Sequence, residues 1–457
     1  MMTSKPTLII PSETQLREFD AKLLLGCVAA EREYPVIIGS QTHIHLNISA
    51  LPKGIYFAKD LQASKVRILD ILEKLGSCIV AWDEEGLITY SPEVYYQRRI
   101  SPKALSHTTL LFAWGKEYES LVKGFPGYKD TPVYVTGNPR LDLLRPELRL
   151  YFEEETNRIR ERFGKFILVN TNFGTLNHFV ENLTSQKPAE ITRASSEINK
   201  YWSERNVYRT ALFDHFRHLL PQLSKVLPEY TIILRPHPAE NHEPWRMAAS
   251  DYHNIQVIHE GNVIPWIMAA QVLIHNSCTT GIEAYLVGTP AIAYQPIVSD
   301  RFDHQLPNAL GHQAFSFSEL ENALRDILNK KTNSRDDSQQ ETVAHNHMAA
   351  LDGSLASDRI MDVIEENERL LTLARPGSLK KYLSGWFQSQ YRASKKRWKS
   401  QFSGNKNSAD YQQHRFPGIS LEEVQVRLSR FQQLLDRFHG LTVKEVSQYI
   451  FSLHRQG

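Results

Sequence analysis

The stretch VLIHNSCTTGIEAYLVGTPAIAYQ, residues 272–295, decides the fold. It begins with the apolar run VLI, passes through small polar residues into a helix-like segment from Ile282, and turns at Gly288-Thr289-Pro290 into the apolar run AIAY. Short runs that are apolar throughout are typical of strands buried on both faces of a sheet. A strand, a helix and a second strand in so few residues predict parallel pairing with a helical crossover.

The same alternation extends along the chain. The runs PTLIIP, PVIIGS, GIYFAK, SCIVAW, TLLFAWG and PVYVTG come first, and FILVNTN, YTIILRP and IQVIHE precede the opening stretch. This pattern predicts an α/β protein of two Rossmann-like domains that face a cleft, with a helical C-terminal extension. We place the domains at 1–150 and 160–330, and the partly basic extension at 331–457. The insert 175–202 is a candidate lid or acceptor-side helix pair.

Length and composition limit the class of protein. A chain of 457 residues exceeds one ordinary core, and 41% hydrophobic with 23% charged residues is typical of a globular protein. The formal net charge of +2 does not indicate a nucleic-acid partner. Cys27, Cys78 and Cys278 fit neither a disulfide framework nor a zinc site, so we expect reduced cysteines, a cytoplasmic location and no metal. No stretch approaches the roughly 20 apolar residues of a membrane span.

Polar residues at the carboxyl ends of parallel strands carry the functional prediction, because ligands bind there. Arg235 and His237 directly follow the strand-like YTII, and Pro236 and Pro238 restrict the backbone that holds them. Arginine and histidine both donate hydrogen bonds to phosphate oxygens. The motif therefore predicts a phosphate site, and the alternative is a turn with a solvated arginine and a packed histidine.

The opening stretch contains the second candidate site. Small hydroxyl residues and a glycine precede the helix-like segment, an arrangement that exposes backbone N–H groups to an anion. We expect Glu283 in the first turn, where it caps the helix or accepts hydrogen bonds from a ribose. An ordinary N-cap is the alternative, and the nearby LRPHP motif favours a ligand. The candidate residues here are Asn276, Ser277, Thr279, Thr280, Gly281 and Glu283.

Carboxylates crowd the end of SCIVAW at Asp83, Glu84 and Glu85. Adjacent carboxylates repel, which can raise the pKa of one of them and suit it to general-base catalysis; a solvated acidic turn is the alternative. Neither a GxGxxG fingerprint nor a P-loop is present. Further candidates at predicted strand ends or turns are Ser12, Glu13, Asn138, Arg140, Asn170 and Asn172.

The motifs WDEEG, TGNPRLDLL, LRPHP, HNSCTTGIEAYLVGTPAIAY and HRFPGISLEEV together resemble the bacterial surface carbohydrate biosynthesis proteins. The resemblance covers Leu8 to about Glu423. Within GT-B glycosyltransferases, a His-Pro motif paired with a Ser/Thr motif resembles enzymes that use CMP-activated acidic sugars such as Kdo or a nonulosonate. The resemblance implies a metal-independent transferase of capsule or lipopolysaccharide type that needs no cofactor beyond its nucleotide-sugar donor.

The resemblance also implies roles for individual residues. His237 would contact the phosphate or ribose of the donor, the hydroxyls of Ser277, Thr279 and Thr280 would hold the phosphate, and Glu283 would bind the ribose. One carboxylate of the acidic triplet 83–85 would act as base, or as nucleophile if configuration is retained.

The implied acceptor is an oligosaccharide or a lipid-linked glycan. The basic, aromatic segment Ser378–Phe402 predicts either contact with anionic lipid at the inner face of the bacterial inner membrane, or a solvated helix whose aromatic side chains pack on the protein. Alternatives for the whole chain are a CDP-glycerol-type glycerophosphotransferase, a UDP-sugar transferase or epimerase, and a non-catalytic GT-B-like scaffold.

Overall fold

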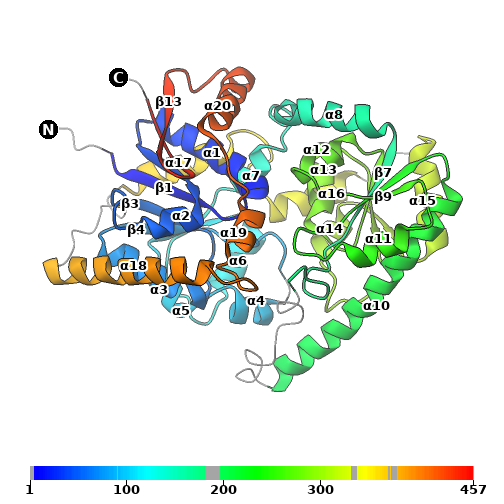
Figure 1. Cartoon of the computed structure of the whole chain (residues 1–457), viewed down its shortest axis with the longest axis horizontal. Helices are drawn as coiled ribbons and strands as arrows, with labels where there is room; N and C mark the ends of the chain where they lie inside the picture. The colour runs from blue at the N-terminus through cyan, green and yellow to red at the C-terminus, as the bar shows by residue number, and fades with distance from the viewer. Residues whose placement is uncertain are drawn as a thin grey trace. The chain divides into compact units, whose positions relative to one another are not determined.

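The computed structural model describes residues 5–89, 91–180, 196–330, 337–368, 371 and 378–455. The chain divides into two compact units, of which unit 1 comprises residues 1–151 and 345–457 and unit 2 comprises residues 152–344. Each unit is built on one sheet with helices packed against it (Figure 1). The predicted α/β class with Rossmann-like sheets is therefore confirmed, whereas the cleft stays a prediction.

Unit 1 contains an eight-stranded sheet in the order β13-β14-β2-β1-β3-β4-β5-β6. The six strands predicted from apolar runs pair in parallel, and the sheet order reverses direction between β1 and β3. Such a topological switch point is where open α/β sheets bind ligands. The strands are β1 (Thr7–Ser12), β2 (Val36–Ser40), β3 (Gly54–Ala58), β4 (Cys78–Ala81), β5 (Leu110–Ala113) and β6 (Val133–Val135).

Helices connect these strands, and the C-terminal region adds further helices to unit 1. The helices are α1 (Gln15–Glu31), α2 (Gln41–Leu46), α3 (Val66–Lys74), α4 (Pro92–Arg98), α5 (Pro102–Leu105), α6 (Lys116–Lys123), α7 (Pro139–Asp142), α17 (Ala356–Glu366), α18 (Leu379–Ser400), α19 (Ala409–Arg415) and α20 (Leu421–Leu435), with 3-10 turns η1 (Ala63–Lys65) and η2 (Arg149–Phe152).

The end of the chain corrects the prediction of a wholly helical extension. Residues 441–456 were expected to form a helix, but β13 (Leu441–Ser447) and β14 (Ile450–Arg455) form an antiparallel hairpin whose second strand pairs with β2. Buried and less buried residues alternate at the start of β13, as the two-residue period of a strand requires. Gly39 of β2 permits the contact, because a Cβ there would lie 2.0 Å from the carbonyl oxygen of Tyr449.

One helix of the C-terminal region packs against the N-terminal part of unit 1. This helix, α17, contacts α1 and α7. The carboxylate of Asp142 accepts hydrogen bonds from the backbone N–H groups of Ala356 (2.7 Å) and Ser357 (2.9 Å). It therefore satisfies two donors at the start of α17 and fixes this helix to α7.

Unit 2 contains a six-stranded, fully parallel sheet in the order β12-β11-β10-β7-β8-β9. If the six strands are numbered 1 to 6 in chain order and the sheet is read from β9, the order is 3-2-1-4-5-6, as in dinucleotide-binding folds. The switch point lies between β7 and β10. The strands are β7 (Phe166–Asn170), β8 (Thr231–Arg235), β9 (Ile255–Val257), β10 (Val272–His275), β11 (Ala291–Tyr294) and β12 (His312–Ala314).

Helices cover the sheet of unit 2, and its core includes Ile167, Leu234 and Ile274 from the strands with Phe216 and Leu324 from the helices. Part of the predicted insert, residues 181–195, lies outside the described residues; α10 begins at Ser196. No helix in the described ranges is both long and apolar enough to cross a membrane. The helices are α8 (Glu153–Phe163), α10 (Ser196–Val226), α11 (Glu243–Ala249), α12 (Val263–Ala269), α13 (Thr279–Val287), α14 (Gln305–Ala309) and α15 (Phe317–Leu328). The last helix, α16 (Asp337–His347), contains the boundary between the two units.

Candidate functional site

Three adjacent strands of unit 2 end at its switch point and bring the predicted residues of this unit together. Asn170, the last residue of β7, lies beside Arg235 of β8 and beside His275 of β10. The side chain of Asn170 is buried, and neither its oxygen nor its nitrogen has a hydrogen-bond partner among the described residues. Buried amides are normally satisfied, so this residue is equipped to bind a ligand.

Side-chain amides join the loops that follow β7 and β10. The Nδ2 atom of Asn276 donates to Oδ1 of Asn172 at 2.9 Å, and Nδ2 of Asn172 donates to the carbonyl of Asn276 at 3.4 Å. Arg209 of α10 also donates to Oδ1 of Asn172, at 2.8 Å. Both predicted asparagines thus position these loops, and the buried Oδ1 of Asn276 has no partner in the described part of the chain.

The start of α13 is open to an anion. The helix begins at Thr279, three residues before the predicted start, and the side chain of its N-cap residue, Cys278, accepts no hydrogen bond from the first turn. The buried hydroxyl of Thr280 has no hydrogen-bond partner within the described ranges. Because helix starts leave backbone N–H groups unsatisfied and carry positive partial charge, this end of α13 favours a phosphate or carboxylate.

The earlier start corrects the prediction for Glu283. This residue is the fifth of α13 and lies beyond the first turn, so it does not cap the helix. Ser277, just before α13, has a left-handed backbone with φ of 53°, and its hydroxyl accepts a hydrogen bond from Nδ2 of Asn308 at 2.9 Å. Such backbone strain in a non-glycine residue occurs often at binding sites.

Gly281 is required by packing. A Cβ at this position would lie 2.5 Å from Nε2 of His275, a fully buried histidine at the end of β10. Burial lowers the pKa of His275 to about 4, so the ring is neutral at physiological pH. Its Nδ1 atom accepts a hydrogen bond from the backbone N–H of Cys278 at 3.3 Å. His275 therefore supports the loop before α13, which sequence reasoning did not identify.

The two basic residues of LRPHP have different environments. Arg235 is buried and donates from Nη1 to the carbonyl of Glu260 at 2.7 Å and from Nη2 to that of Gly261 at 2.6 Å. These contacts make Arg235 a support of the strand end, and its contact with phosphate stays a prediction. Burial lowers the pKa of Arg235 to about 10.

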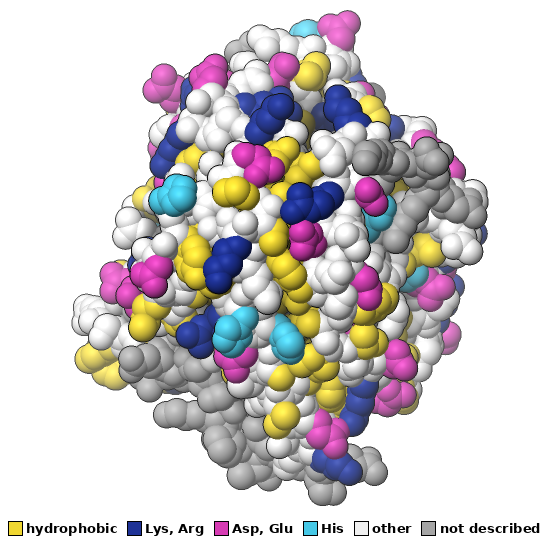
Figure 2. Space-filling model, turned by 90° about the vertical axis from the view of Figure 1, so that its right-hand side faces the viewer, with side chains coloured by type: hydrophobic (Ala, Val, Ile, Leu, Met, Phe, Trp, Pro, Cys, Tyr) yellow, Lys and Arg dark blue, Asp and Glu magenta, His cyan; other side chains and the backbone are white. Residues whose placement is uncertain are grey.

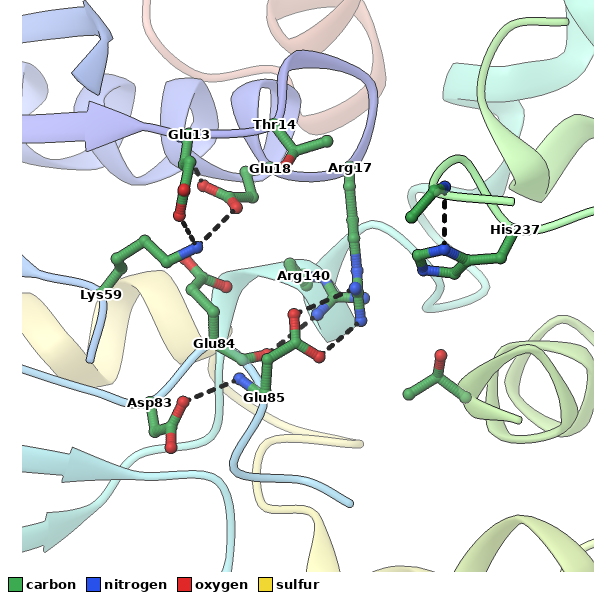
Figure 3. Close-up of polar contacts among 12 residues, drawn as sticks. Glu13, Thr14, Arg17, Glu18, Lys59, Asp83, Glu84, Glu85, Arg140 and His237 are labelled. Carbon is green, nitrogen blue, oxygen red and sulfur yellow. Dashed lines mark hydrogen bonds and ion pairs between the residues drawn. The ribbon is translucent and has the colours of Figure 1, made fainter. Parts of the chain in front are cut away.

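His237 is only partly buried, and Pro238 after it is exposed. The Nδ1 atom of His237 accepts a hydrogen bond from the backbone N–H of Ala239 at 3.1 Å (Figure 3). In the neutral ring the proton is therefore on Nε2, which makes Nε2 a hydrogen-bond donor. This is the protonation that a phosphate ligand requires of a neutral histidine.

Glu240 is a buried residue of this site that sequence reasoning missed. Its Oε1 atom accepts hydrogen bonds from Thr171 Oγ1 (2.9 Å) and from the backbone N–H groups of Phe173 (2.8 Å) and His237 (3.1 Å). Its Oε2 atom accepts from Nε1 of Trp245 at 2.9 Å. One carboxylate thus joins the loops after β7 and β8. The only signal in the sequence is a glutamate two residues beyond the His-Pro pair.

The carboxyl edge of the sheet in unit 1 contains a buried network of charges. The Nζ atom of Lys22 contacts Oε2 of Glu18 and Oε1 of Glu84, each at 2.8 Å, and donates to the carbonyl of Pro11 at 2.9 Å. Lys59 contacts Glu18 at 3.5 Å and pairs with Glu13 (Figure 3). We call Glu13, Glu18, Lys22, Lys59 and Glu84 the charge network, and it lies at the switch point between β1 and β3.

The three predicted catalytic carboxylates lie close together but differ in their partners. Asp83 is buried, pairs with Arg99 and accepts a hydrogen bond from the Tyr95 hydroxyl at 3.1 Å. Burial raises the pKa of Asp83, against the opposing effect of Arg99. Glu84 belongs to the charge network. The side chain of Glu85 is 44% exposed and pairs with Arg17 at 3.0 Å (Figure 3). Each of the three carboxylates therefore has its own cationic partner, which offsets the mutual repulsion that the sequence predicted.

The remaining candidates of unit 1 lie at the same edge. Oδ1 of Asn138 caps α7 by accepting from the backbone N–H of Arg140 at 3.0 Å, and Arg140 donates to the carbonyl of Glu84 at 3.2 Å. The buried hydroxyl of Ser12 has no partner among the described residues. Burial alone would raise the pKa of Glu13, but Lys59 and Arg415 outweigh it and hold that pKa at about 2.

Comparisons with known proteins leave the family open. No protein-family model matches the chain, and no curated protein matches it in sequence. Within the described residues no three His, Cys, Asp or Glu side chains are grouped as a metal site would require. Metal independence stays a prediction.

Several solved structures are similar to the chain. The wall teichoic acid polymerase TagF is 12% identical, with a TM-score of 0.48 over 80% of this chain and 90% of that one. The UDP-GlcNAc 2-epimerase from Methanocaldococcus jannaschii is 13% identical, with a TM-score of 0.49 over 79% and 99%. HepE from Anabaena, in complex with UDP and glucose, is 13% identical, with a TM-score of 0.41 over 81% and 100%. Likeness at this level does not indicate a shared activity.

Proposed function

We propose that the chain is a glycosyltransferase of bacterial surface polysaccharide synthesis and that unit 2 binds the nucleotide part of its donor. The observation that carries the proposal is the uncapped start of α13 at the switch point of unit 2, where the buried hydroxyl of Thr280 has no partner among the described residues. Unsatisfied polar groups at this position of an open α/β sheet are suited to a phosphorylated ligand.

In this proposal the donor phosphate lies at the start of α13. Backbone N–H groups and the Thr280 hydroxyl bind its oxygens, and Nε2 of His237 donates to the phosphate or to the ribose. These donors stabilise the negative charge that develops on the departing nucleotide. The resemblance in sequence favours a CMP-activated acidic sugar, such as Kdo or a nonulosonate, as the donor and a glycan as the acceptor. The ribose contact of Glu283 is part of the same proposal.

Thermal unfolding with added nucleotides tests the proposal. We expect CMP to raise the melting temperature, since a ligand at 100 times its Kd stabilises the folded state by about 2.7 kcal/mol. Thr280→Val retains the shape of the side chain but removes its hydroxyl, and His237→Ala removes the imidazole donor, so both should reduce the shift. Thr342→Val is the matched control, because its hydroxyl is exposed and donates to the carbonyl of Ser338 in α16, away from the proposed site.

The choice of nucleotide separates the alternatives. A larger shift with CDP would favour a glycerophosphotransferase, and a larger shift with UDP would favour a UDP-sugar enzyme. If no nucleotide changes the melting temperature, the proposed site is wrong and a non-catalytic scaffold is favoured. An unchanged CMP shift in Thr280→Val would show that the start of α13 does not bind the nucleotide.

For the chemical step we assign the base to Glu85, the one carboxylate of the triplet that reaches solvent. Glu85→Gln should retain the CMP shift and lower the release of CMP from CMP-Kdo, with a glycan acceptor present, by about 10²- to 10⁴-fold. Glu84→Gln should instead lower stability, because Glu84 pairs with buried Lys22. Release that is unchanged in Glu85→Gln would contradict the assignment.

A further inference from the structure

The helix α18 contacts unit 1 with its small residues. Gly385, Ser389 and Ala393 are its buried residues and recur at every fourth position, so they form one stripe. The helix packs against α3 and α2 (Figure 1). At Gly385 a Cβ would lie 2.7 Å from Cβ of Lys74 in α3, so a larger residue would force the helices apart. The protein-facing side of α18 is therefore made of its smallest side chains.

The large apolar residues of α18 face solvent. Leu383, Phe387 and Tyr391 are four residues apart and Trp398 follows seven residues later, which places them on one side of the helix. Phe387 is 63% exposed and Trp398 is 59% exposed. Seven of the sixteen exposed large hydrophobic side chains of the described residues lie between Leu379 and Phe402. A concentration of this kind marks an interaction surface, whereas single exposed apolar residues need no explanation.

The charge of α18 has one sign. The helix contains seven basic residues and no acidic residue: Lys380, Lys381, Arg392, Lys395, Lys396, Arg397 and Lys399. The face of the molecule in Figure 2, in contrast, carries acidic and basic side chains intermixed. A second copy of α18 would bring further cations to this surface and be repelled. The charge therefore selects an anionic partner.

Basic side chains near the protein side of α18 are incompletely neutralised. Burial, Arg392 and Lys65 together lower the pKa of Lys396 to about 7, an effect that Glu13 offsets only in part. The Nη1 atom of Arg392 is buried and has no hydrogen-bond partner among the described residues. Both side chains therefore face unit 1, and an anionic partner is expected at the exposed basic residues of α18 instead.

We propose that α18 lies on the surface of an anionic lipid bilayer. The aromatic side chains enter the headgroup region, and the basic side chains on both sides of them contact lipid phosphates. The long stems of lysine and arginine let their charged ends reach the headgroups from several positions around the helix. The proposal does not depend on the nucleotide site, because α18 belongs to unit 1 and the nucleotide is assigned to unit 2.

Flotation of the full-length chain with lipid vesicles tests this proposal. We expect binding to vesicles of phosphatidylcholine with about one quarter phosphatidylglycerol, little binding to phosphatidylcholine alone, and weaker binding at high salt. Phe387→Glu combined with Trp398→Glu should lower the partition coefficient at least about tenfold, because both exposed side chains then repel the anionic surface. Met247→Glu is the matched control: Met247 is 66% exposed on α11 of unit 2.

The variants are first compared by thermal unfolding, and we expect unchanged melting temperatures because the substituted side chains are exposed. Equal recovery of the wild-type chain with neutral and anionic vesicles would overturn the proposal, as would a double variant that floats like the wild type. The wild-type chain could instead form a concentration-dependent dimer, bind no vesicles, and lose the dimer in the double variant. That result would assign the surface to a second copy of the chain and overturn the lipid proposal. The CMP shift is measured on the same proteins, so failure of one proposal is distinguishable from failure of the other.

Discussion

Replacing Lys22 by alanine is expected to lower the free energy of unfolding by about 3–5 kcal/mol. The Lys22 side chain is 3% exposed, and its ammonium group contacts Glu18, Glu84 and the carbonyl of Pro11. Without the ammonium group, the carboxylates of Glu18 and Glu84 remain buried near each other and lose a shared cation. A buried charge without its partner is costly because it has also lost its hydration. Unfolding in urea, followed by circular dichroism, measures the change.

Lys123→Ala is the matched control for Lys22→Ala. Lys123 pairs with Glu119 at 2.7 Å with the same four-residue spacing as Lys22 and Glu18, but its side chain is 50% exposed. Solvent screens such a pair, so the expected loss is much smaller than the loss for Lys22→Ala. Adding Glu84→Gln to Lys22→Ala should recover part of the lost stability, because it removes one of the uncompensated buried charges. Equal losses for Lys22→Ala and Lys123→Ala would show that burial of the network has no energetic consequence.

The parallel strands could be predicted because the fold buries them on both faces. Runs such as FILV and VLI are short and apolar throughout, as strands of a parallel sheet covered by helices on both faces are. The hairpin of β13 and β14 could not be predicted in the same way. It lies at the edge of the sheet and contains exposed polar residues at Lys444 and Glu445, so its short alternation was taken for a helix face. The strand β12 has only three residues, too few for a period to show.

The location of the candidate site follows from the sequence, but the bonding of its residues does not. Strand ends are visible as the points where apolar runs stop, and parallel pairing brings them to one edge. Whether Arg235 meets a ligand or the carbonyls of Glu260 and Gly261 depends on how a loop 25 residues later folds. Lys22 sits within the apolar segment KLLLG as one polar residue of a helix. Periodicity does not reveal that Glu84, from a distant segment of the chain, neutralises it together with Glu18 of the same helix.

Glu240→Ala is expected to destabilise the fold by about 3–5 kcal/mol and to abolish the CMP-induced shift in melting temperature. The substitution leaves four buried or partly buried donors without their acceptor, among them the backbone N–H of His237 and Nε1 of Trp245. The loop that carries His237 then loses the contacts through the Glu240 carboxylate to the loop after β7, while backbone hydrogen bonds at Ala239 and Asn241 still join the two loops. Glu240 is a positioning residue in this account, because it acts on the nucleotide through His237.

A double-mutant cycle distinguishes this positioning from a general loss of stability. In Glu240→Gln, the amide oxygen can take the place of Oε1 and keep its three donors. The amide N–H₂ then takes the place of Oε2 and faces Nε1 of Trp245, so two hydrogen-bond donors oppose each other. Trp245→Phe removes that opposing donor, so the double variant should lose less stability than the sum of the two single variants, by about 1 kcal/mol or more. The double variant should also regain the CMP shift that Glu240→Gln weakens. If stability recovers but the CMP shift does not, Glu240 holds the fold without orienting His237; if neither recovers, the assigned hydrogen bonds of Glu240 are wrong.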